Sequence, residues 1–153
     1  MIMVRWMFVV VIAMLLGFIV YVSLNNGVPE GLGVNEGNLA PCPAMPNCVS
    51  SQASTEDTEH YVEPIIYRGD AMETQLKVEQ FILDATDARI LDSQLGYSHI
   101  EISSPLLGFN DDLELYFPEA DSVIHVRSAS RVGYDDLGAN RERVRQIREL
   151  LVD

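Results

Sequence analysis

The hydrophobic positions of the chain form one continuous run near the N-terminus and several short alternating runs after residue 60. The continuous run, "WMFVVVIAMLLGFIVYVSL", covers residues 6–24 and contains no charged side chain. A helix rises about 1.5 Å per residue, so this run spans roughly 28 Å, close to the thickness of the hydrocarbon core of a bilayer. The run therefore predicts a transmembrane anchor.

A cleavable signal peptide is the alternative for residues 6–24, and the flanking sequence favours the anchor. Signal peptides have an apolar stretch of about 7–15 residues followed by a small-residue cleavage site, whereas this longer run ends in "SLNNGVPEG". Arg5 precedes the run, and the next Lys or Arg after it is Arg68. Because positive charge favours the cytoplasmic side, residues 1–5 are predicted to be cytoplasmic. The rest of the chain is predicted to lie outside the inner (plasma) membrane, in the periplasm or an equivalent space.

Two features follow the predicted anchor. Residues 25–40 are rich in Gly and Asn without periodicity, which predicts a flexible linker. The stretch "PCPAMPNCVSSQ" then contains the two cysteines of the chain, Cys42 and Cys48. Structural zinc normally needs four Cys or His ligands, and a redox couple prefers C-x-x-C. Outside the membrane disulfides persist, so we predict a disulfide, with metal and redox chemistry as the weaker alternatives and no cofactor.

Residues 41–153 have the pattern of an α+β domain. "YVEPIIY" is a predicted strand that Pro64 directs to a sheet edge, and "ARILDSQ" is a predicted short strand. Alternation within "YSHIEIS", "DDLELYF" and "SVIHVRSASR" predicts three further strands. The predicted order is strand, helix, three or four antiparallel strands and helix. This order favours one antiparallel sheet with two helices packed on one face and the other face open.

The two predicted helices are amphipathic. Asp70 and Glu73 fit a capping box at the start of the first helix. Asp136 or Asn140 is predicted to cap the last helix, "NRERVRQIRELLVD". The apolar positions expected to face the sheet are Met72, Leu76, Phe81 and Ile82 in the first helix, and Val144, Ile147 and Leu151 in the last.

The open face of the predicted sheet carries charged and histidine side chains. If "PEAD" is a four-residue hairpin loop, Glu114 lies opposite His125 and Asp112 opposite Arg127 on this face. A divalent metal site is one hypothesis, and cross-strand charge pairs on a wet surface are the simpler one, which we favour. We therefore predict no metal, with His99, Glu101, Glu114 and His125 as the weak candidate ligands.

The net charge is −13, yet six of the ten basic residues lie between Arg127 and Arg148. Arg141, Arg145 and Arg148 are spaced to share one side of the last helix. Such a cluster can receive a carboxylate or phosphate of a partner, or it can neutralise the protein's own carboxylates. The acidic balance and the predicted location argue against nucleic acid as a partner. Nothing matches G-x-S-x-G, H-E-x-x-H or a phosphate-binding glycine loop, so enzymatic activity is uncertain and less favoured.

Three segments carry a resemblance to a known family: "APCPAMPNCVSSQ", "FNDDLELYF" and "VIHVRSASRVGYDDLGANRERVRQIR". Over roughly residues 39–152 the chain resembles the domain-of-unknown-function 1499 family of bacterial envelope proteins and plastid relatives. That family is uncharacterised, so the resemblance implies no activity and no catalytic residues. It does indicate positions to test. The candidate ligand-binding residues are Asp111, Asp112, His125, Arg127, Ser128, Ser130, Arg131, Asp136, Asn140 and Arg141.

Two hypotheses of function follow, and we favour the first. In the first, the chain is a non-catalytic binding or accessory module of the cell envelope, anchored in the membrane by residues 6–24. It then binds an envelope protein, a lipid headgroup or a small anionic ligand at a corner formed by Arg127, Arg131 and Arg141. In the second, it is a metal-dependent or acid-base hydrolytic enzyme that uses the His and carboxylate side chains of the sheet. A structural accessory whose polar corner holds the fold is a third possibility.

Overall fold

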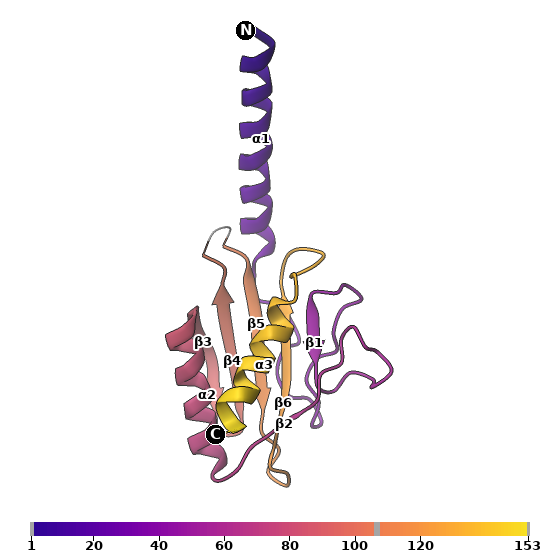
Figure 1. Ribbon diagram of the computed structural model, residues 1–153, viewed down its shortest axis with the longest axis vertical. Helices are drawn as coiled ribbons and strands as arrows, with labels where there is room; N and C mark the ends of the chain where they lie inside the picture. The colour runs from indigo at the N-terminus through magenta and orange to yellow at the C-terminus, as the bar shows by residue number, and fades with distance from the viewer. Residues whose placement is uncertain (1, 106–107, 153) are drawn as a thin grey trace.

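The computed structural model describes residues 2–105 and 108–152. Met1, the first residue of the predicted cytoplasmic segment, and Asp153, the last residue of the predicted last helix, lie outside the described residues. Figure 1 shows α1 projecting from a domain formed by the other elements. In chain order the elements are α1 (Ile2–Asn25), β1 (Cys48–Ser50), β2 (Ile65–Ile66), α2 (Ala71–Ala85), β3 (Asp87–Gln94), β4 (Tyr97–Ser103), β5 (Asn110–Tyr116), β6 (Val123–Ser130) and α3 (Ala139–Val152).

Helix α1 is apolar on all sides, and most of its described side chains are exposed. Its residues Met3–Asn25 are long and apolar enough to cross a membrane. Near its C-terminal end the helix contacts the domain, because Val22 is buried and the ring of Phe18 packs edge-on against Phe109, with 6.1 Å between the ring centroids. The end of α1 is therefore attached to the domain by side-chain contacts as well as by the backbone that continues into the domain.

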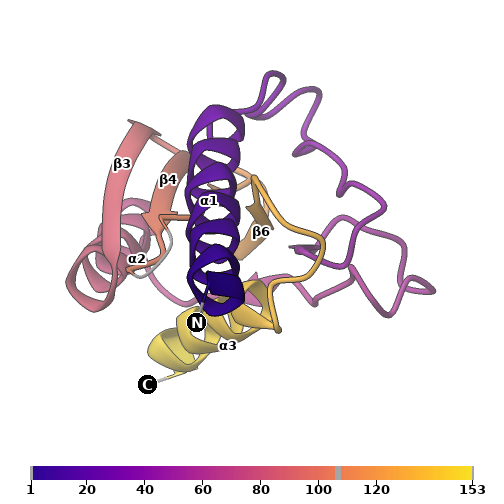
Figure 2. The same cartoon turned by 90° about the horizontal axis from the view of Figure 1, so that it is seen from above.

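The sheet is antiparallel, with strand order β1-β6-β5-β4-β3, and β2 pairs with another part of β6. Figures 1 and 2 show α2 and α3 on the same face, which confirms the predicted α+β architecture. The strand expected over residues 61–67 is reduced to β2, which begins directly after Pro64. Proline lacks the N–H donor that a strand ladder needs. Strand β1, in contrast, was not predicted.

The register between β5 and β6 differs from the prediction by two residues. Leu115 pairs with Val126, and Glu114 lies opposite Arg127 rather than His125. The last pair of the two strands is Tyr116 with His125, so eight residues, 117–124, separate the paired positions instead of the four predicted, and β6 uses Val123 and Ile124 to pair with β2. Side chains alternate along a strand, so a shift of two leaves every residue on its predicted face and changes its cross-strand neighbour.

The core lies between the sheet and the two helices. Val144 and Ile147 of α3 are buried in it and Leu151 packs against it, as the helical spacing predicted. The other buried apolar side chains of this core are Val49, Val62, Ile65, Tyr67, Val78, Ile82, Ile100, Ile102, Leu113, Leu115, Phe117, Ile124 and Val126.

The prediction for α2 was partly wrong. Asp70 caps the helix by accepting a hydrogen bond from the backbone N–H of Glu73, as expected. Met72 and Leu76, however, are more than half exposed. The helix instead turns Gln75 toward the sheet, where its side-chain amide donates to the hydroxyl of Ser98 and to backbone carbonyls of the β3–β4 hairpin. Polar contacts to the hairpin therefore help set the orientation of α2.

Residues 26–39 lie over the second face of the sheet, which was predicted to be open. The backbone N–H of Gly33 donates to the Glu114 carboxylate over 2.7 Å, and that of Leu39 donates to Gln52 over 2.7 Å. We refer to residues 26–39 as the cover segment. The sequence predicted a flexible linker here, and the structure differs because the segment finds hydrogen-bond partners on the sheet and on the loop after β1.

Candidate functional site

The structure divides the predicted ligand-binding residues among four places. One group lies beneath the cover segment, one between the sheet and the start of α3, one beside β1, and one on the outer side of α3. The group beneath the cover segment is Asp112, Arg127 and Arg131. The group at the start of α3 is Asp111, Ser128, Ser130, Asp136 and Asn140. His125 lies beside β1, and Arg141 lies on the outer side of α3. The predicted corner of Arg127, Arg131 and Arg141 is therefore not formed.

Arg131 is the centre of the group beneath the cover segment. Its Nε and Nη2 donate to the two oxygens of Asp112 over 2.9 and 2.6 Å, and its Nη1 donates to Glu101 over 2.5 Å. Asp112 also contacts Nε2 of His99 at 2.8 Å. Burial by itself raises the pKa of the Asp112 carboxyl, but the hydrogen bonds from Arg131 and His99 outweigh burial and lower it below 3.8. The group is a buried, charge-paired network.

Glu114 is the second centre on this face, and its side chain is fully buried. It accepts hydrogen bonds from Arg127 over 3.2 Å, from the Tyr97 hydroxyl over 2.9 Å and from the backbone of Gly33. Burial and the Glu114 carboxylate together raise the pKa of Tyr97, so its hydroxyl stays a donor. Nε of Arg127 is buried without a partner among the described residues. Arg127 and Arg131 are thus bound to carboxylates of the chain itself.

Asn140 joins three segments at the start of α3. Its side-chain oxygen accepts from Ser128 over 2.6 Å, and its Nδ2 donates to the hydroxyl of Ser130 and to the carbonyl of Asn47. Ser128 and Ser130 point to the helix side of β6, as the alternation predicted. The buried amide therefore connects α3 to β6 and to the residue before β1.

Arg143 completes this junction and was not among the predicted site residues. It donates to Asn140 and Ser128, and its Nη2 pairs with Asp111 over 2.7 Å. Its position three residues after Asn140, on the same helix face, is the sequence signal that points to it. Asp136 accepts from the backbone N–H of Asn140 over 2.8 Å, which confirms Asp136 as the capping carboxylate.

His125 lies apart from both networks. Its Nδ1 is 3.2 Å from the hydroxyl of Ser51, and its ring stacks on Tyr116. The Ser51 oxygen also accepts from the backbone N–H of Val126 over 2.9 Å. Burial lowers the pKa of His125 below 6.5. A Ser–His contact is the arrangement that activates a nucleophile, but within the described residues no carboxylate is bonded to the imidazole.

No three His, Cys, Asp or Glu side chains among the described residues are grouped to hold a metal ion. The weak candidate ligands have other partners. His99 bonds Asp112, and Glu101 pairs with Arg89 and Arg131. Glu114 and His125 lie in the separate contacts described above.

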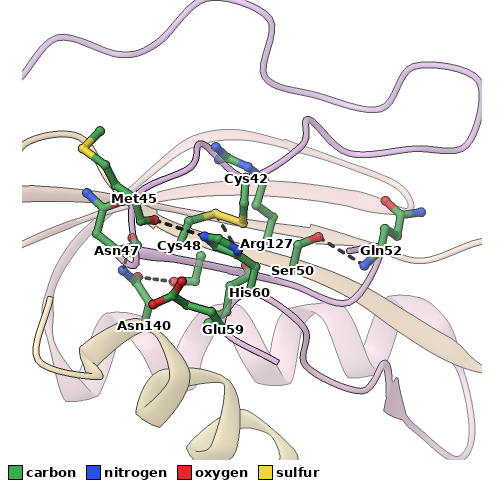
Figure 3. The surroundings of a disulfide bond; sticks show 12 residues. Cys42, Met45, Asn47, Cys48, Ser50, Gln52, Glu59, His60, Arg127 and Asn140 are labelled. Atoms are coloured by element: carbon green, nitrogen blue, oxygen red, sulfur yellow. Dashed lines mark hydrogen bonds between the residues drawn. A yellow bond between two sulfur atoms is a disulfide. The ribbon is translucent and has the colours of Figure 1, made fainter. Parts of the chain in front are cut away.

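The disulfide between Cys42 and Cys48 forms as predicted, with 5.7 Å between the two Cα atoms. Figure 3 shows His60 beside it, with its Nε2 directed at the carbonyl of Met45. Nδ1 of His60 bonds the Asp57 carboxylate over 2.8 Å, and this bond raises the pKa of His60 above 6.5. The disulfide therefore closes the loop that leads into β1.

A groove between α3 and residues 61–63 has a volume of about 630 Å³, and its charged lining residues are Arg141, Arg145, Arg148, Glu63 and Glu142. Arg141 donates to the backbone carbonyls of Tyr61 and Glu59 over 2.9 and 2.7 Å. Arg148 donates to those of Glu63 and Pro64 over 2.7 and 3.1 Å. We call this feature the arginine groove.

Besides Arg143, α3 carries three arginines, and these three differ in how their charges are compensated. Arg145 forms ion pairs with Glu142 and Glu149 of its own helix. Among the described residues, neither Arg141 nor Arg148 has a carboxylate within 4.0 Å. Backbone carbonyls orient these two guanidinium groups but, being uncharged, do not neutralise their positive charges.

A model of the family described as "Protein of unknown function (DUF1499)" matches residues 38–151. The chain belongs to this family. The DUF1499 region begins at the end of the cover segment and runs through α3, so α1 precedes it. No curated protein and no solved structure matches the chain. The functional argument for this DUF1499 protein therefore rests on its own geometry.

Proposed function

We propose that this DUF1499 protein is a non-catalytic binding module of the cell envelope that takes an anionic group in the arginine groove. Residues 6–24 of α1 anchor it in the inner membrane, with the N-terminus cytoplasmic and the domain periplasmic or otherwise extracytoplasmic. Arg5 on one side of the apolar run supports this orientation. The disulfide supports an oxidising compartment for the domain.

The observation that carries the binding proposal is the uncompensated charge of Arg141 and Arg148. A guanidinium group has five N–H donors, and the contacts to backbone carbonyls occupy part of each set. The remaining donors suit a carboxylate or a phosphate, which arginine binds in a planar, two-pronged geometry. In a chain of net charge −13, two such groups in one groove provide a local site for an anion.

The non-catalytic part of the proposal rests on the groups beneath the cover segment. A general acid or base has to reach the proton that it transfers. Asp112 and Glu114 are at most 1% exposed and already bond to arginines of the chain. Their contacts are those of a network that holds the sheet, and this supports an accessory or binding role over the hydrolytic alternative.

A titration of the full chain in phosphatidylcholine nanodiscs tests the proposal. The probes are inorganic phosphate and a short polyglutamate peptide, and binding is followed by NMR of the arginine Nε–H signals. We expect saturable shifts of Arg141 and Arg148. Loss of one charged hydrogen bond corresponds to about tenfold weaker binding, which we expect for Arg141→Ala and Arg148→Ala.

Arg68→Ala is the matched control, because Arg68 is exposed and lies outside the groove. Its binding should equal that of the unmodified chain. Absence of saturable binding for both probes, or equal weakening in all three variants, would refute an anion site in the groove. Binding of the peptide without binding of phosphate would identify an acidic protein segment as the partner.

The Ser51–His125 contact is the observation that favours the hydrolytic alternative. The test is a fluorophosphonate probe, which labels activated serines, applied to the full chain. We expect no labelling, because the Ser51 oxygen is buried and accepts a backbone hydrogen bond. Labelling that disappears in Ser51→Ala would establish the acid-base enzyme instead.

A further inference from the structure

We infer that the domain is seated in the outer leaflet of the bilayer that α1 crosses, through apolar side chains of two loops beside α1. This inference rests on the anchoring role proposed for α1. One contact is Phe109, immediately before β5. The other is the β6–α3 loop, residues 131–138, which carries Tyr134 and Leu137. The partner of this surface is the hydrocarbon edge of a lipid leaflet.

The depth of Phe109 follows from its contact with α1. Phe18 precedes Leu24, the end of the apolar run, by six residues, which at 1.5 Å per residue is about 9 Å along the helix axis. The ring of Phe109 packs against that of Phe18 with 6.1 Å between centroids. If α1 spans the bilayer, Phe109 therefore reaches the level of the acyl chains rather than the water.

Asn26 fixes the domain at this level. Its side chain donates to the carbonyl of Gly108 over 2.5 Å and accepts from the backbone N–H of Asn110 over 2.9 Å. Its carbonyl accepts from Arg131 over 2.9 Å. The residue that follows α1 is thus bonded to both ends of the membrane-side surface. These bonds restrict rotation of the domain relative to the helix.

The β6–α3 loop presents its apolar side chains on the same side. Tyr134 is 72% exposed and Leu137 is 95% exposed. Figure 1 shows this loop reaching the level of the last turn of α1, and Figure 2 shows it on one side of α1 with β4 on the other. Tyrosine is enriched at the boundary between lipid and water. Loop and helix together place apolar side chains in one leaflet.

The conformation of the loop is held by its own side chains. Leu137 has a φ of 55°, which is unfavourable for a residue with a branched side chain. Asp135 accepts from the backbone N–H of Leu137 over 2.7 Å, and Asp136 accepts from that of Gly138 over 2.9 Å. The loop is therefore built to direct Leu137 outward. The two carboxylates indicate a zwitterionic rather than an anionic lipid surface.

Leu95 provides an internal comparison. It is 80% exposed and lies in the β3–β4 hairpin, at the end of the domain opposite to α1 (Figure 1). Single exposed apolar residues are common on protein surfaces. The level relative to α1, and not exposure alone, distinguishes Leu137 from Leu95, so the two residues form a matched pair for a test.

The experiment measures the depth of single tryptophans in the full chain. Trp6→Phe removes the native tryptophan, and Leu137→Trp, Phe109→Trp and Leu95→Trp are made separately in that background. Each chain is reconstituted in phosphatidylcholine vesicles with brominated acyl chains, which quench tryptophan at short range. We expect at least about twofold quenching and a blue-shifted emission for positions 137 and 109, and neither change for position 95.

Flotation of the vesicles separates failure of this inference from failure of the anchor. A chain that floats with the vesicles while position 137 stays unquenched overturns the inference and leaves the anchor intact. A chain that does not float contradicts the anchor, and the seated domain with it. Anion binding in the arginine groove is measured independently of both. If thermal unfolding shows that Leu137→Trp does not fold, Tyr134→Trp replaces it. Quenching at position 95 as strong as that at position 134 would also overturn the inference.

Discussion

Both faces of the sheet are buried over β4, β5 and β6, by different chemistry. The face under α2 and α3 carries aliphatic side chains such as Ile100 and Leu113, which have no polar atoms to satisfy. The face under the cover segment carries charged side chains, which are buried with hydrogen-bond partners. Alternation of polar and apolar residues therefore identified two faces, but it did not identify which face was exposed.

The two faces contribute differently to stability. Burial of aliphatic area stabilises the helix-covered face directly. On the covered polar face the gain from each ion pair is offset by the cost of removing charges from water. Removing one partner there leaves the other charge buried and unpaired, so single substitutions have effects larger than the net contribution of the pair. The first two predictions compare the faces on this basis.

The largest loss is expected for Arg131→Ala. It leaves Asp112 and Glu101 buried without their common partner, and such changes cost about 3–5 kcal/mol. The measurement is urea-induced unfolding of the full chain in detergent. Arg68→Ala, an exposed arginine, serves as the control and should unfold at the unmodified urea concentration. If the two variants unfold alike, the network beneath the cover segment is not buried in solution.

Leu113→Ala probes the aliphatic face at the position of β5 that follows Asp112. Its side chain is fully buried, and deletion of a leucine side chain costs about 2–5 kcal/mol through lost burial and the remaining cavity. The same urea measurement applies. Leu95→Ala is the exposed control. A loss below about 1 kcal/mol for Leu113→Ala would contradict close packing between the sheet and the helices.

Loss of the disulfide, which lies at the β1 edge of the sheet, should have an intermediate effect on the free energy of unfolding. A closed ring of seven residues restricts the unfolded chain by about 2–2.5 kcal/mol, so Cys42→Ser with Cys48→Ser should lower stability by that amount. Reductant should destabilise the unmodified chain and leave the double variant unchanged. Equal sensitivity of both proteins to reductant would rule out the disulfide as the cause.

A smaller loss is expected for Asn26→Ala, which releases the start of the cover segment. It removes two hydrogen bonds, and a net loss of about 1–2 kcal/mol follows. Hydrogen exchange should accelerate in residues 26–34 and in β5 more than in α3. Asn25→Ala is the control, because Asn25 bonds back to its own helix. Uniform acceleration across the domain would contradict a local role for the cover segment.

The smallest effect is a dependence of the melting temperature on pH. The raised pKa of His60 gives stability that is present below pH 6.5 and is lost as the pH rises through the folded pKa. The lowered pKa of His125 acts in the opposite direction, because stability is present above pH 6.5 and is lost as the pH falls through its folded pKa. Together they predict a maximum near pH 6.5.

Two substitutions separate these contributions in a thermal-unfolding series. Asp57→Asn removes the partner of His60 and should flatten the decline above pH 6.5. His125→Gln should flatten the decline below pH 6.5 and leave the upper side unchanged. A single monotonic trend that neither substitution changes would show that other groups control the pH dependence.

The sequence by itself determined the features that depend on local pattern. The apolar run marked α1, and period-two alternation assigned the side chains of β4, β5 and β6 to the correct faces. The two cysteines and the predicted compartment were enough for the pairing of Cys42 with Cys48, and close spacing in the chain was enough for the cap at Asp70. Each of these depends on residues that are near one another in sequence or on a repeat of fixed period.

The tertiary structure decided the features that depend on distant partners. A shift of two residues preserves the alternation, so the pattern could not distinguish Arg127 from His125 as the neighbour of Glu114. The helical spacing likewise left the rotation of α2 open until its contacts with the β3–β4 hairpin formed. Arg131 reached Glu101 and Asp112 through the arrangement of three strands, and the cover segment closed over them by hydrogen bonds to the sheet. These contacts join residues far apart in the chain, and their free energy depends on burial that exists only in the folded state.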